Sequence, residues 1–532
     1  MTPIPGKSSV LIIGAGPSGL MMAAQLLRNG IQPVIIDAKT KASQHSKALV
    51  IQARSLEIFR QMGLHQSVLN QGNKISGLVI HKGHNDSVTL DLSGLGESKS
   101  YFSNILILEQ SRTERILIDF LTANTCPIYW NSELVELSQS DSGVAVEIKR
   151  GNSIEVINCD WLIGADGASS KVRKLLSIPF RGGTYHQQFY LADVQLPFAL
   201  NKDIIQVFIK NEGFAGLFPL KGDVVRFMGM LPNNLSEKED ITFADIKPYL
   251  TFTLDFPLQY EACNWFSVYQ LHHRMVDKFN IQRCFLIGDA AHVHSPVGGQ
   301  GMNTGLQDAY NLGWKLAGVI KGSYQKSILE SYAAERMPVA ELLLKLTDRL
   351  FSFNVSSNWF VRKLRNWLLP ALLPILWKKK GLADKVFSII SQTGINYRNS
   401  SLSVHHSRIK SVKAGDRLPF LKFYDEKQSC ETDLHSWCNA TRYTLLVIGT
   451  LSKRDLFLMA KWIKQAYPHS LNFYYLPYSK RNKHVFNYFE INERQKLSVI
   501  VRPDMHIAYV NDVVDIELVD TYLKKNACFE KG

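Results

Sequence analysis

The stretch Ser9-Val-Leu-Ile-Ile-Gly-Ala-Gly-Pro-Ser-Gly19 decides the fold of this 532-residue chain. A β-branched apolar run leads into a glycine-rich turn, and residues 20–29 follow as an apolar, helix-like stretch. A second apolar run, Pro33-Val-Ile-Ile-Asp37, ends in a carboxylate. The order of strand, glycine turn, helix, strand and acid is typical of a dinucleotide-binding unit.

Each conspicuous residue of this unit has a physical role in holding a dinucleotide. Gly14 allows the tight turn, Gly16 lets the backbone approach a pyrophosphate, and Gly19 allows close packing of the helix on the strand. The helix N-terminus supplies unpaired N–H groups and the positive end of the helix dipole. Asp37 can accept hydrogen bonds from the diol of a ribose. A glycine turn without a ligand is the alternative.

Two further motifs join glycine to an acid at the end of an apolar run. Trp161-Leu-Ile-Gly-Ala-Asp-Gly-Ala-Ser-Ser-Lys-Val-Arg173 contains Asp166-Gly167, and Arg283-Cys-Phe-Leu-Ile-Gly-Asp-Ala-Ala-His292 contains Gly288-Asp289. The second motif is followed by Ser295-Pro-Val-Gly-Gly-Gln-Gly-Met-Asn303 and a helix-like stretch. Either motif is common in isolation, but the three motifs in this order form a highly specific pattern.

The composition is that of a globular protein with full cores. Lys+Arg 61 against Asp+Glu 47 gives a net charge of +14, and 45% of the residues are hydrophobic, which excludes a disordered or collagen-like chain. No basic stripe interleaved with aromatic residues is found, so we expect no nucleic-acid binding. The seven cysteines are scattered and never spaced as CxxC, which disfavours a disulfide scaffold and a structural zinc site. The first apolar run is too short for a signal peptide, and we expect a cytoplasmic protein.

Changes of pattern divide the chain into segments. We expect the first part of the dinucleotide-binding domain in residues 1–184 and an antiparallel sheet that walls a substrate pocket in residues 185–275. Residues 276–395 are expected to form the second part of the dinucleotide-binding domain with helices. Residues 396–401 are polar and suit a linker to a small α/β domain in residues 402–532.

The three motifs resemble those of the class A FAD-dependent aromatic hydroxylases of the para-hydroxybenzoate hydroxylase type. The closer resemblance is to the phenol hydroxylase and polyketide hydroxylase branch, because of Leu329-Glu-Ser-Tyr-Ala-Ala-Glu-Arg-Met-Pro338 and Val501-Arg-Pro-Asp504. This resemblance implies an α/β and α+β architecture. Its parts are a Rossmann-like FAD-binding domain with an inserted antiparallel substrate sheet, a helical segment and a C-terminal thioredoxin-like domain.

The resemblance also implies a set of FAD contacts. FAD is expected to be noncovalent, since no Cys or His stands in a flavin-attachment motif. Asp289 is implied to bind the ribityl hydroxyls, and the helix that starts near Gly299 is implied to lie beneath the pyrimidine ring, where its N–H groups stabilise negative charge. The residues implied to hold FAD are Gly14, Gly16, Gly19, Asp37, Lys47, Gln110, Asp289, Pro296, Gly299, Gly301, Met302 and Asn303.

Some of these contacts have alternatives. Lys47 stands where many relatives carry an Arg that contacts the pyrophosphate, and it keeps the charge but lacks the bidentate fork. Arg54 can share that role or be a solvated arginine on a helix surface. Gln110 matches an FAD-contacting Gln of the family, with a polar residue at a strand end as the alternative.

NADPH or NADH, the implied co-substrate, has no dinucleotide fold of its own in this family. Residues 166–173 are implied to serve both cofactors, with Asp166 and Arg173 as contacts. Lys171 is a further candidate for a basic partner, with a plain surface lysine as the favoured alternative. His292 and His294 lie two residues apart, but no third ligand lies at metal spacing, and we expect no metal site.

The sequence does not identify a catalytic base. A base that removes a phenolic proton favours hydroxylation of the ring, but Leu49 stands where phenol hydroxylases carry an Asp. Tyr269 matches a pocket tyrosine of the relatives and is predicted to contact substrate, with a buried structural tyrosine as the alternative. His272, His273 and Arg274 remain further candidates.

We therefore predict an FAD-dependent monooxygenase that uses NAD(P)H and molecular oxygen to hydroxylate a small aromatic or polyketide-like ring. The alternatives are a flavin enzyme of different chemistry, such as an epoxidase or reductase, and a non-catalytic flavin-binding protein. A homodimer is left open by the sequence.

Residues 362–380 combine basic residues with the apolar stretch Trp367-Leu-Leu-Pro-Ala-Leu-Leu-Pro-Ile-Leu-Trp377. This stretch is about half the roughly 20 residues that a membrane-spanning helix needs. We expect its apolar residues to belong to the core between the domains. Shallow insertion into an anionic membrane surface is the alternative.

Overall fold

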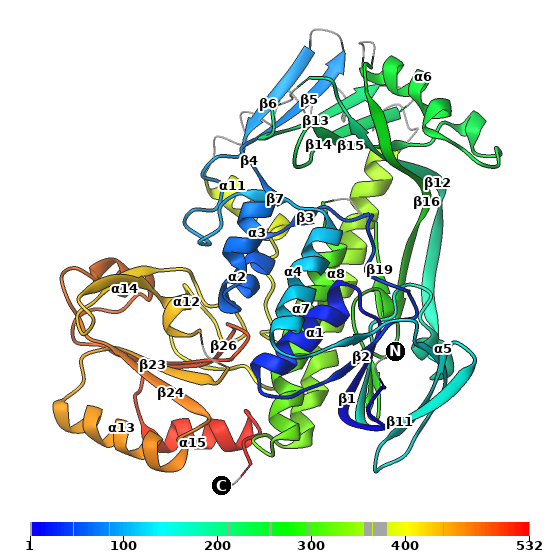
Figure 1. Cartoon of the computed structure of the whole chain (residues 1–532). Coiled ribbons are helices and arrows are strands. Elements are labelled where there is room, and N and C mark those ends of the chain that lie inside the picture. The colour runs from blue at the N-terminus through cyan, green and yellow to red at the C-terminus, as the bar shows by residue number, and fades with distance from the viewer. Residues whose placement is uncertain are drawn as a thin grey trace.

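The computed structural model describes residues 3–45, 47–83, 86–198, 201–210, 213–254, 258–295, 298–355, 364, 380–439 and 441–530. It has the mixed α/β architecture predicted from the sequence. Figure 1 shows a central layer of helices, a sheet of long strands above it, and the C-terminal domain packed against its side.

The glycine turn belongs to a mainly parallel sheet, which we call the nucleotide sheet. β1 pairs in parallel with β2 and β11, and α1 packs against α4 and α7 beside it. The strand order is β17 (Asn280–Ile281), β18 (Cys284–Leu286), β11 (Ser153–Gly164), β1 (Lys7–Ile13), β2 (Val34–Ile36) and β8 (Ile128–Tyr129). The antiparallel strands β9 (Glu133–Gln139) and β10 (Val144–Arg150) extend it from β11. The helices are α1 (Pro17–Arg28), α4 (Gln110–Ala123) and α7 (Gly301–Ile320).

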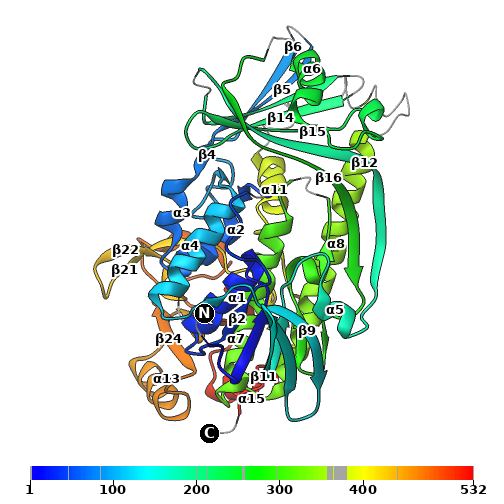
Figure 2. The same ribbon diagram turned by 45° about the vertical axis from the view of Figure 1, so that its right-hand side comes forward.

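Another sheet, which we call the long-strand sheet, stands over the nucleotide domain. Its strands β12 and β16 run from the upper sheet down beside the nucleotide domain (Figure 2). The helix α6 (Phe243–Leu254) packs on one face through Ile246 and Leu250. The strand order is β19 (His292–Val293), β16 (Ala262–Val276), β12 (Phe180–Gln195), β15 (Val224–Met230), β14 (Gly213–Pro219), β13 (Ile204–Lys210), β5 (Gly77–Gly83) and β6 (Asp86–Asp91).

The long-strand sheet differs from the sequence-based division in two respects. The predicted boundary between residues 184 and 185 falls inside β12, and β5 and β6 join the sheet although they precede that boundary. The sheet is also not wholly antiparallel, because β13 pairs in parallel with β5. Parallel partners need a long connection, and here more than a hundred residues separate the two strands, so no local pattern indicates the pairing.

The C-terminal domain is a mixed sheet with helices on its faces, as predicted for a thioredoxin-like unit. β23 pairs in parallel with β24 and antiparallel with β25. The strands are β20 (Val404–His406), β26 (Ile507–Asn511), β25 (Lys496–Val501), β23 (Tyr443–Gly449) and β24 (Leu471–Leu476), with the hairpin β21 (Lys422–Asp425) and β22 (Cys430–Asp433) beside them. The helices are α12 (Leu434–Trp437), α13 (Lys453–Ala466), α14 (Lys483–Tyr488) and α15 (Ile516–Lys525).

The remaining elements connect these parts. One buried apolar cluster is continuous from the nucleotide domain into the C-terminal domain, for example where Trp314 and Tyr324 pack on Tyr443. The connecting elements are α2 (Ala53–Gln61), α3 (His65–Gln71), α5 (Lys171–Leu175), α8 (Glu330–Val355), α11 (Lys380–Ile390) and the small sheet of β3 (Val50–Ile51), β7 (Ile105–Ile107) and β4 (Asn73–Ile75).

No helix in the described ranges is both long and apolar enough to cross a membrane. The basic and apolar segment at residues 362–380 lies outside the described residues, apart from Leu364 and the start of α11 at Lys380.

Candidate functional site

The glycine turn between β1 and α1 leaves space where a ligand is expected. A Cβ at Gly14 or Gly19 would overlap backbone atoms of the turn and of Ala165, so the packing of the turn itself requires these two glycines. A Cβ at Gly16 would meet nothing within 4 Å. Gly16 also precedes α1 without a side-chain cap on the helix. The open space and the uncapped N–H groups together suit a pyrophosphate.

Asp37 lies beside this turn, at the end of β2. Its Oδ2 accepts a hydrogen bond from Ala15 N at 2.7 Å, and its Oδ1 accepts one from Lys39 N at 2.8 Å. The side chain is buried and its orientation is fixed by the backbone. Each carboxylate oxygen can accept more than one hydrogen bond, which leaves capacity for a ribose diol.

Asp289 lies on a short 3₁₀ turn, Gly288–Ala290, that follows β18. Its side chain is exposed, but the protein around it limits hydration, and this loss of hydration raises the pKa of the carboxyl above its ordinary value. The neighbours His292 and Lys47 lower that pKa in part. Asp289 is therefore an accessible acid held among basic groups.

Lys47 and Tyr269, predicted for cofactor and substrate respectively, are brought together by the fold. The Lys47 Nζ atom lies 5.0 Å from the centroid of the Tyr269 ring. Lys47 also lowers the pKa of Asp289, so its charge acts on the acid of the nucleotide domain as well as lying over the tyrosine of the long-strand sheet. Burial raises the pKa of Tyr269 to about 12, so its hydroxyl stays protonated at neutral pH.

The start of α7 is built into the same region. Asn303 is buried, its Nδ2 donates to the carbonyl oxygens of Val50 and Gly299 at 2.8 Å, and its Oδ1 accepts from Gln52 N at 2.9 Å. Gly299 has a φ of +64°, where an L side chain would be strained. The side chain of Asn303 is thus engaged by the protein itself. Gly301 begins α7, Met302 is half-buried behind it, and Pro296 lies outside the described residues.

Asp166 precedes α5, and Arg173 lies within that helix. Asp166 Oδ2 accepts hydrogen bonds from Lys171 N and Val172 N, whereas its buried Oδ1 has no hydrogen-bond partner. Arg173 is buried, and its guanidinium donates to Ala290 O at 2.9 Å and Ala168 O at 2.7 Å. Arg173 therefore supports the residue that follows Asp289, and its contact with NADPH stays a prediction. Lys171 is a surface residue 3.5 Å from Glu133.

The sequence-based alternative of a solvated Arg54 is wrong, because Arg54 is buried on α2, ion-paired with Glu57 at 3.0 Å, and donates to Asp504 O at 2.7 Å. Its contact with the pyrophosphate stays a prediction. Gln110 is the first residue of α4, and its Nε2 donates to Glu114 Oε1 at 2.8 Å. Its contact with FAD stays a prediction.

The candidates for a base are engaged as follows. Leu49 is buried in an apolar cluster with Ile107 and Leu220. The Nδ1 atom of His272 lies 2.8 Å from Thr184 Oγ1, which also accepts a hydrogen bond from Arg274. Burial, and then the nearby charges that include Arg274, lower the pKa of His272. The ring of His273 packs on Tyr185, at 4.7 Å between centroids. None of these contacts selects a base for the reaction.

Sequence reasoning missed a buried group at the centre of this region. Asp308 of α7 accepts hydrogen bonds from His292 Nε2 and from Arg336 Nε, both at 2.7 Å. His294 Nδ1 lies 2.9 Å from Ser295 O. Arg336 lies in the Leu329–Pro338 motif, which was a signal, but spacing alone does not reveal that α8 turns this arginine toward α7.

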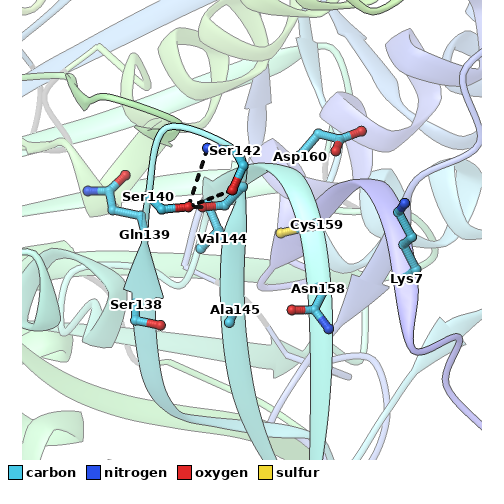
Figure 3. Close-up of a pocket in the computed structure, with 11 residues that line it drawn as sticks. Lys7, Ser138, Gln139, Ser140, Ser142, Val144, Ala145, Asn158, Cys159 and Asp160 are labelled. Atoms are coloured by element: carbon cyan, nitrogen blue, oxygen red, sulfur yellow. Dashed lines mark hydrogen bonds between the residues drawn. The ribbon is translucent and has the colours of Figure 1, made fainter.

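A cavity of about 300 Å³ lies elsewhere, at the β9–β10 hairpin and β11 (Figure 3). Its lining includes Lys7, at the amino end of β1, whereas the glycine turn is at the carboxyl end. Ligands of open α/β sheets bind at the carboxyl ends of the strands. The cavity is therefore separate from the candidate site.

Comparison with known proteins gives two family matches. The model described as "FAD binding domain" matches residues 7–347, and the model described as "Phenol hydroxylase, C-terminal dimerisation domain" matches residues 457–530. Pentachlorophenol 4-monooxygenase of Sphingobium chlorophenolicum is 32% identical, over 83% of this chain and 81% of its own. The 6-methylpretetramide 4-monooxygenase of Streptomyces rimosus is also 32% identical, over 76% of this chain and 72% of its own.

Solved structures show the same fold. The anhydrotetracycline hydroxylase OxyS from Streptomyces rimosus superposes with a TM-score of 0.79 at 25% identity, over 99% of this chain and 100% of its own. The ternary complex of aklavinone-11 hydroxylase with FAD and aklavinone superposes with a TM-score of 0.81 at 20% identity, over 97% and 98% of the two chains.

Proposed function

The chain belongs to the FAD-dependent aromatic hydroxylase family and is a monooxygenase, and we propose that it hydroxylates an aromatic or polyketide-like ring held between Asp289 and the long-strand sheet. The observation that supports this proposal is that Lys47 Nζ lies 5.0 Å from the centroid of the Tyr269 ring and that its charge also acts on the pKa of Asp289. NAD(P)H supplies the reducing equivalents in this family.

The residues of the site fit FAD. Gly16 leaves space at the uncapped N-terminus of α1, Asp37 has acceptor capacity, and the buried Oδ1 of Asp166 lacks a partner. We assign the pyrophosphate to the glycine turn, the ribose to Asp37, and the ribityl hydroxyls to Asp289. The N–H groups at the start of α7 would face the pyrimidine edge and stabilise negative charge there. When bound, FAD supplies hydride acceptance and activation of molecular oxygen.

The long-strand sheet offers an apolar surface for an aromatic ring. Phe189 and Leu271 form a small apolar cluster with Met230 and Tyr269 on this sheet. Tyr269 keeps its proton at neutral pH and can donate a hydrogen bond to a substrate oxygen. Because Leu49 is apolar and buried, we assign no carboxylate base, and the side chains here act by orienting the ring and excluding water.

The test is turnover by the purified holoprotein. We expect a member of a panel of phenols, quinones and polyphenols to accelerate NADPH or NADH oxidation and to gain one oxygen atom that carries the label from ¹⁸O₂. Tyr269→Phe should raise the KM for that compound more than it lowers NADPH oxidation without substrate. Faster oxidation with only hydrogen peroxide as product, or an oxygen atom from water, would contradict a monooxygenase reaction with that compound.

The C-terminal domain offers a surface for a second copy of the chain. Phe457, Leu458 and Leu518 of α13 and α15 are 66%, 43% and 45% exposed. The two helices are neighbours, joined by the Tyr467 hydroxyl, which donates to Asp520 at 2.7 Å. The match to a dimerisation domain covers both helices almost completely. We infer that this face pairs two copies.

Light scattering after size exclusion tests this pairing. Phe457→Glu should convert a dimer into a monomer, since a charge would be buried in an apolar interface. The matched control is Ile154→Glu on β11, where the wild-type residue is 60% exposed. A monomeric wild-type protein, or dissociation by both substitutions, would contradict the assignment of the interface.

A further inference from the structure

Asp308 is a buried carboxylate that joins three elements around the Asp289 turn. Its Oδ2 accepts hydrogen bonds from Gly288 N at 3.0 Å and from His292 Nε2 at 2.7 Å. Its Oδ1 accepts a hydrogen bond from Arg336 Nε of α8 at 2.7 Å. The side chains of Asp308, His292 and Arg336 are almost fully inaccessible to solvent. One carboxylate therefore holds both ends of the segment that contains Asp289.

The neighbouring contacts tie this segment to the flavin domain and to the substrate side. Arg336 Nη2 donates to Thr304 O near the start of α7, which fixes α8 relative to that helix end. His292 is the first residue of β19 and pairs with Met275 of β16 in the long-strand sheet. The His292 ring also stacks on Phe279, with 5.8 Å between centroids. The position of Asp289 therefore depends on contacts to both sides of the site.

Charge supports the same arrangement. Although burial alone would raise it, the charges of Arg336 and His292 hold the pKa of Asp308 below its ordinary value, so Asp308 accepts hydrogen bonds as a carboxylate. Among the groups that act on Asp289, His292 and Lys47 lower its pKa and Asp308 raises it. His292 bonds to Asp308 and favours the ionised form of both acids.

We propose that His292 and Asp308 are positioning residues for FAD, which hold the Gly288–Ala290 turn so that the Asp289 carboxylate meets the cofactor. This inference rests on the assignment of Asp289 to FAD in the proposed function. Neither residue is required to touch FAD. If they act through Asp289, their substitution removes the contribution of Asp289 to FAD affinity and has little further effect on that affinity.

The test measures FAD binding to the apoprotein by quenching of flavin fluorescence. His292→Phe keeps the ring packing on Phe279 and removes the N–H group that bonds to Asp308. We expect it to raise the Kd of FAD at least tenfold, and Asp289→Asn to do the same. In the double variant the Kd should match that of Asp289→Asn alone, because two residues that act through one contact are not additive.

The outcomes distinguish the FAD-binding role of Asp289 from the positioning role of His292 and Asp308. If Asp289→Asn leaves the Kd unchanged, the FAD role of Asp289 is overturned. If Asp289→Asn raises the Kd but His292→Phe does not, or if the two effects add, the positioning role is overturned. A matched control is His435→Phe, which replaces a buried histidine whose Nε2 lies 2.8 Å from Leu418 O and whose ring packs on Phe420. It should leave the Kd unchanged.

A second measurement protects the test against a general loss of folding. Asp308→Asn keeps the size of the side chain and should also raise the Kd while the thermal midpoint of the apoprotein stays above the assay temperature. In His292→Phe, the loss of FAD affinity on acidification should begin at a higher pH than in the wild type, because a neighbour that lowers the pKa of the Asp289 carboxyl is removed. An identical pH profile in both proteins would contradict the proposal.

Discussion

Arg173 shows how a single side chain can be assigned one role by its sequence and another by its contacts. The motif places it with NADPH, whereas the fold directs its guanidinium to the carbonyl oxygens of Ala290 and Ala168 and over the ring of Phe180, at 3.9 Å from the ring centroid. Ala290 directly follows Asp289. Arg173 is thus a support of the same turn that Asp308 holds from the other side.

We expect Arg173→Ala to lower the FAD content of the purified protein. Each lost hydrogen bond from a charged group is worth about 1.5–3 kcal/mol, and the carbonyl of Ala290 is left without this donor. The measurement is the ratio of flavin to protein after purification. The KM for NADPH, determined at equal flavin occupancy, then tests the sequence-based role: a rise supports contact with NADPH, and an unchanged value assigns Arg173 to support alone.

The part of the site that local sequence predicts is the part built from neighbouring residues. The glycine turn and Asp37 belong to one strand, helix and strand unit, and Asp37 bonds to Ala15, only 22 residues earlier. Arg54 could not be assigned in this way, because its partner Asp504 is 450 residues away. Likewise, spacing shows that His292 and His294 are near each other but not that Asp308 folds back to bond with His292.

At the scale of elements, the turn before α1 contains glycines with two different roles. Gly14 and Gly19 are required by the packing of the turn, whereas Gly16 leaves the space that we assign to the ligand. A Cβ at Gly19 would overlap the carbonyl oxygen of Gly14, which packs between helix and strand. Gly16 has a φ of −80°, which other residues adopt, and space around it. The two positions therefore make a matched pair within one motif.

We expect Gly16→Ala to fold normally and to bind FAD weakly, since its methyl group would occupy the space assigned to the pyrophosphate. Gly19→Ala should lower the thermal midpoint of the apoprotein as well, because helix and strand must move apart. Thermal unfolding of both apoproteins, followed by FAD titration, tests the pair. Full FAD affinity in Gly16→Ala would contradict the assignment of the phosphate site.

At the scale of the whole molecule, the C-terminal domain is joined to the flavin domain by buried charges. Arg502 forms a bidentate pair with Glu335 of α8, at 2.6 and 2.9 Å, and Trp314 of α7 donates to Asp504 at 3.2 Å. The match to the phenol hydroxylase C-terminal domain confirms the branch that the motif Val501–Asp504 indicated, and the fold shows that this motif docks on α7 and α8. The same helices carry Asp308 and Arg336. They therefore support both the docked C-terminal domain and the turn that contains Asp289.

Glu57 of α2 lies at the same junction. Its ionisation determines how this junction contributes to folding stability in acid. Its carboxylate accepts hydrogen bonds from Ser100 at 2.7 Å and from Arg417 and Arg54 at 3.0 Å. Although burial would raise it, the charges of Arg417, His435 and Arg54 hold the pKa of Glu57 at about 2, below the ordinary 4.5. A depressed pKa in the folded state means that the unfolded state binds the proton first. The stabilisation of the folded state by the Glu57 carboxylate is therefore complete above about pH 4.5 and is lost as the pH falls toward 2.

We expect Glu57→Gln to destabilise the protein at pH 7 by about 3–5 kcal/mol, because two buried arginines lose their charged partner. Its stability should then fall less steeply than that of the wild type between pH 4.5 and 3, since this carboxylate no longer titrates. Urea unfolding at several pH values measures both effects. The matched control is Glu341→Gln, whose pair with Lys345 at 3.7 Å is exposed and should change stability by less than about 1 kcal/mol. Equal effects of the two substitutions, or parallel acid profiles for Glu57→Gln and the wild type, would show that the junction does not depend on this charge.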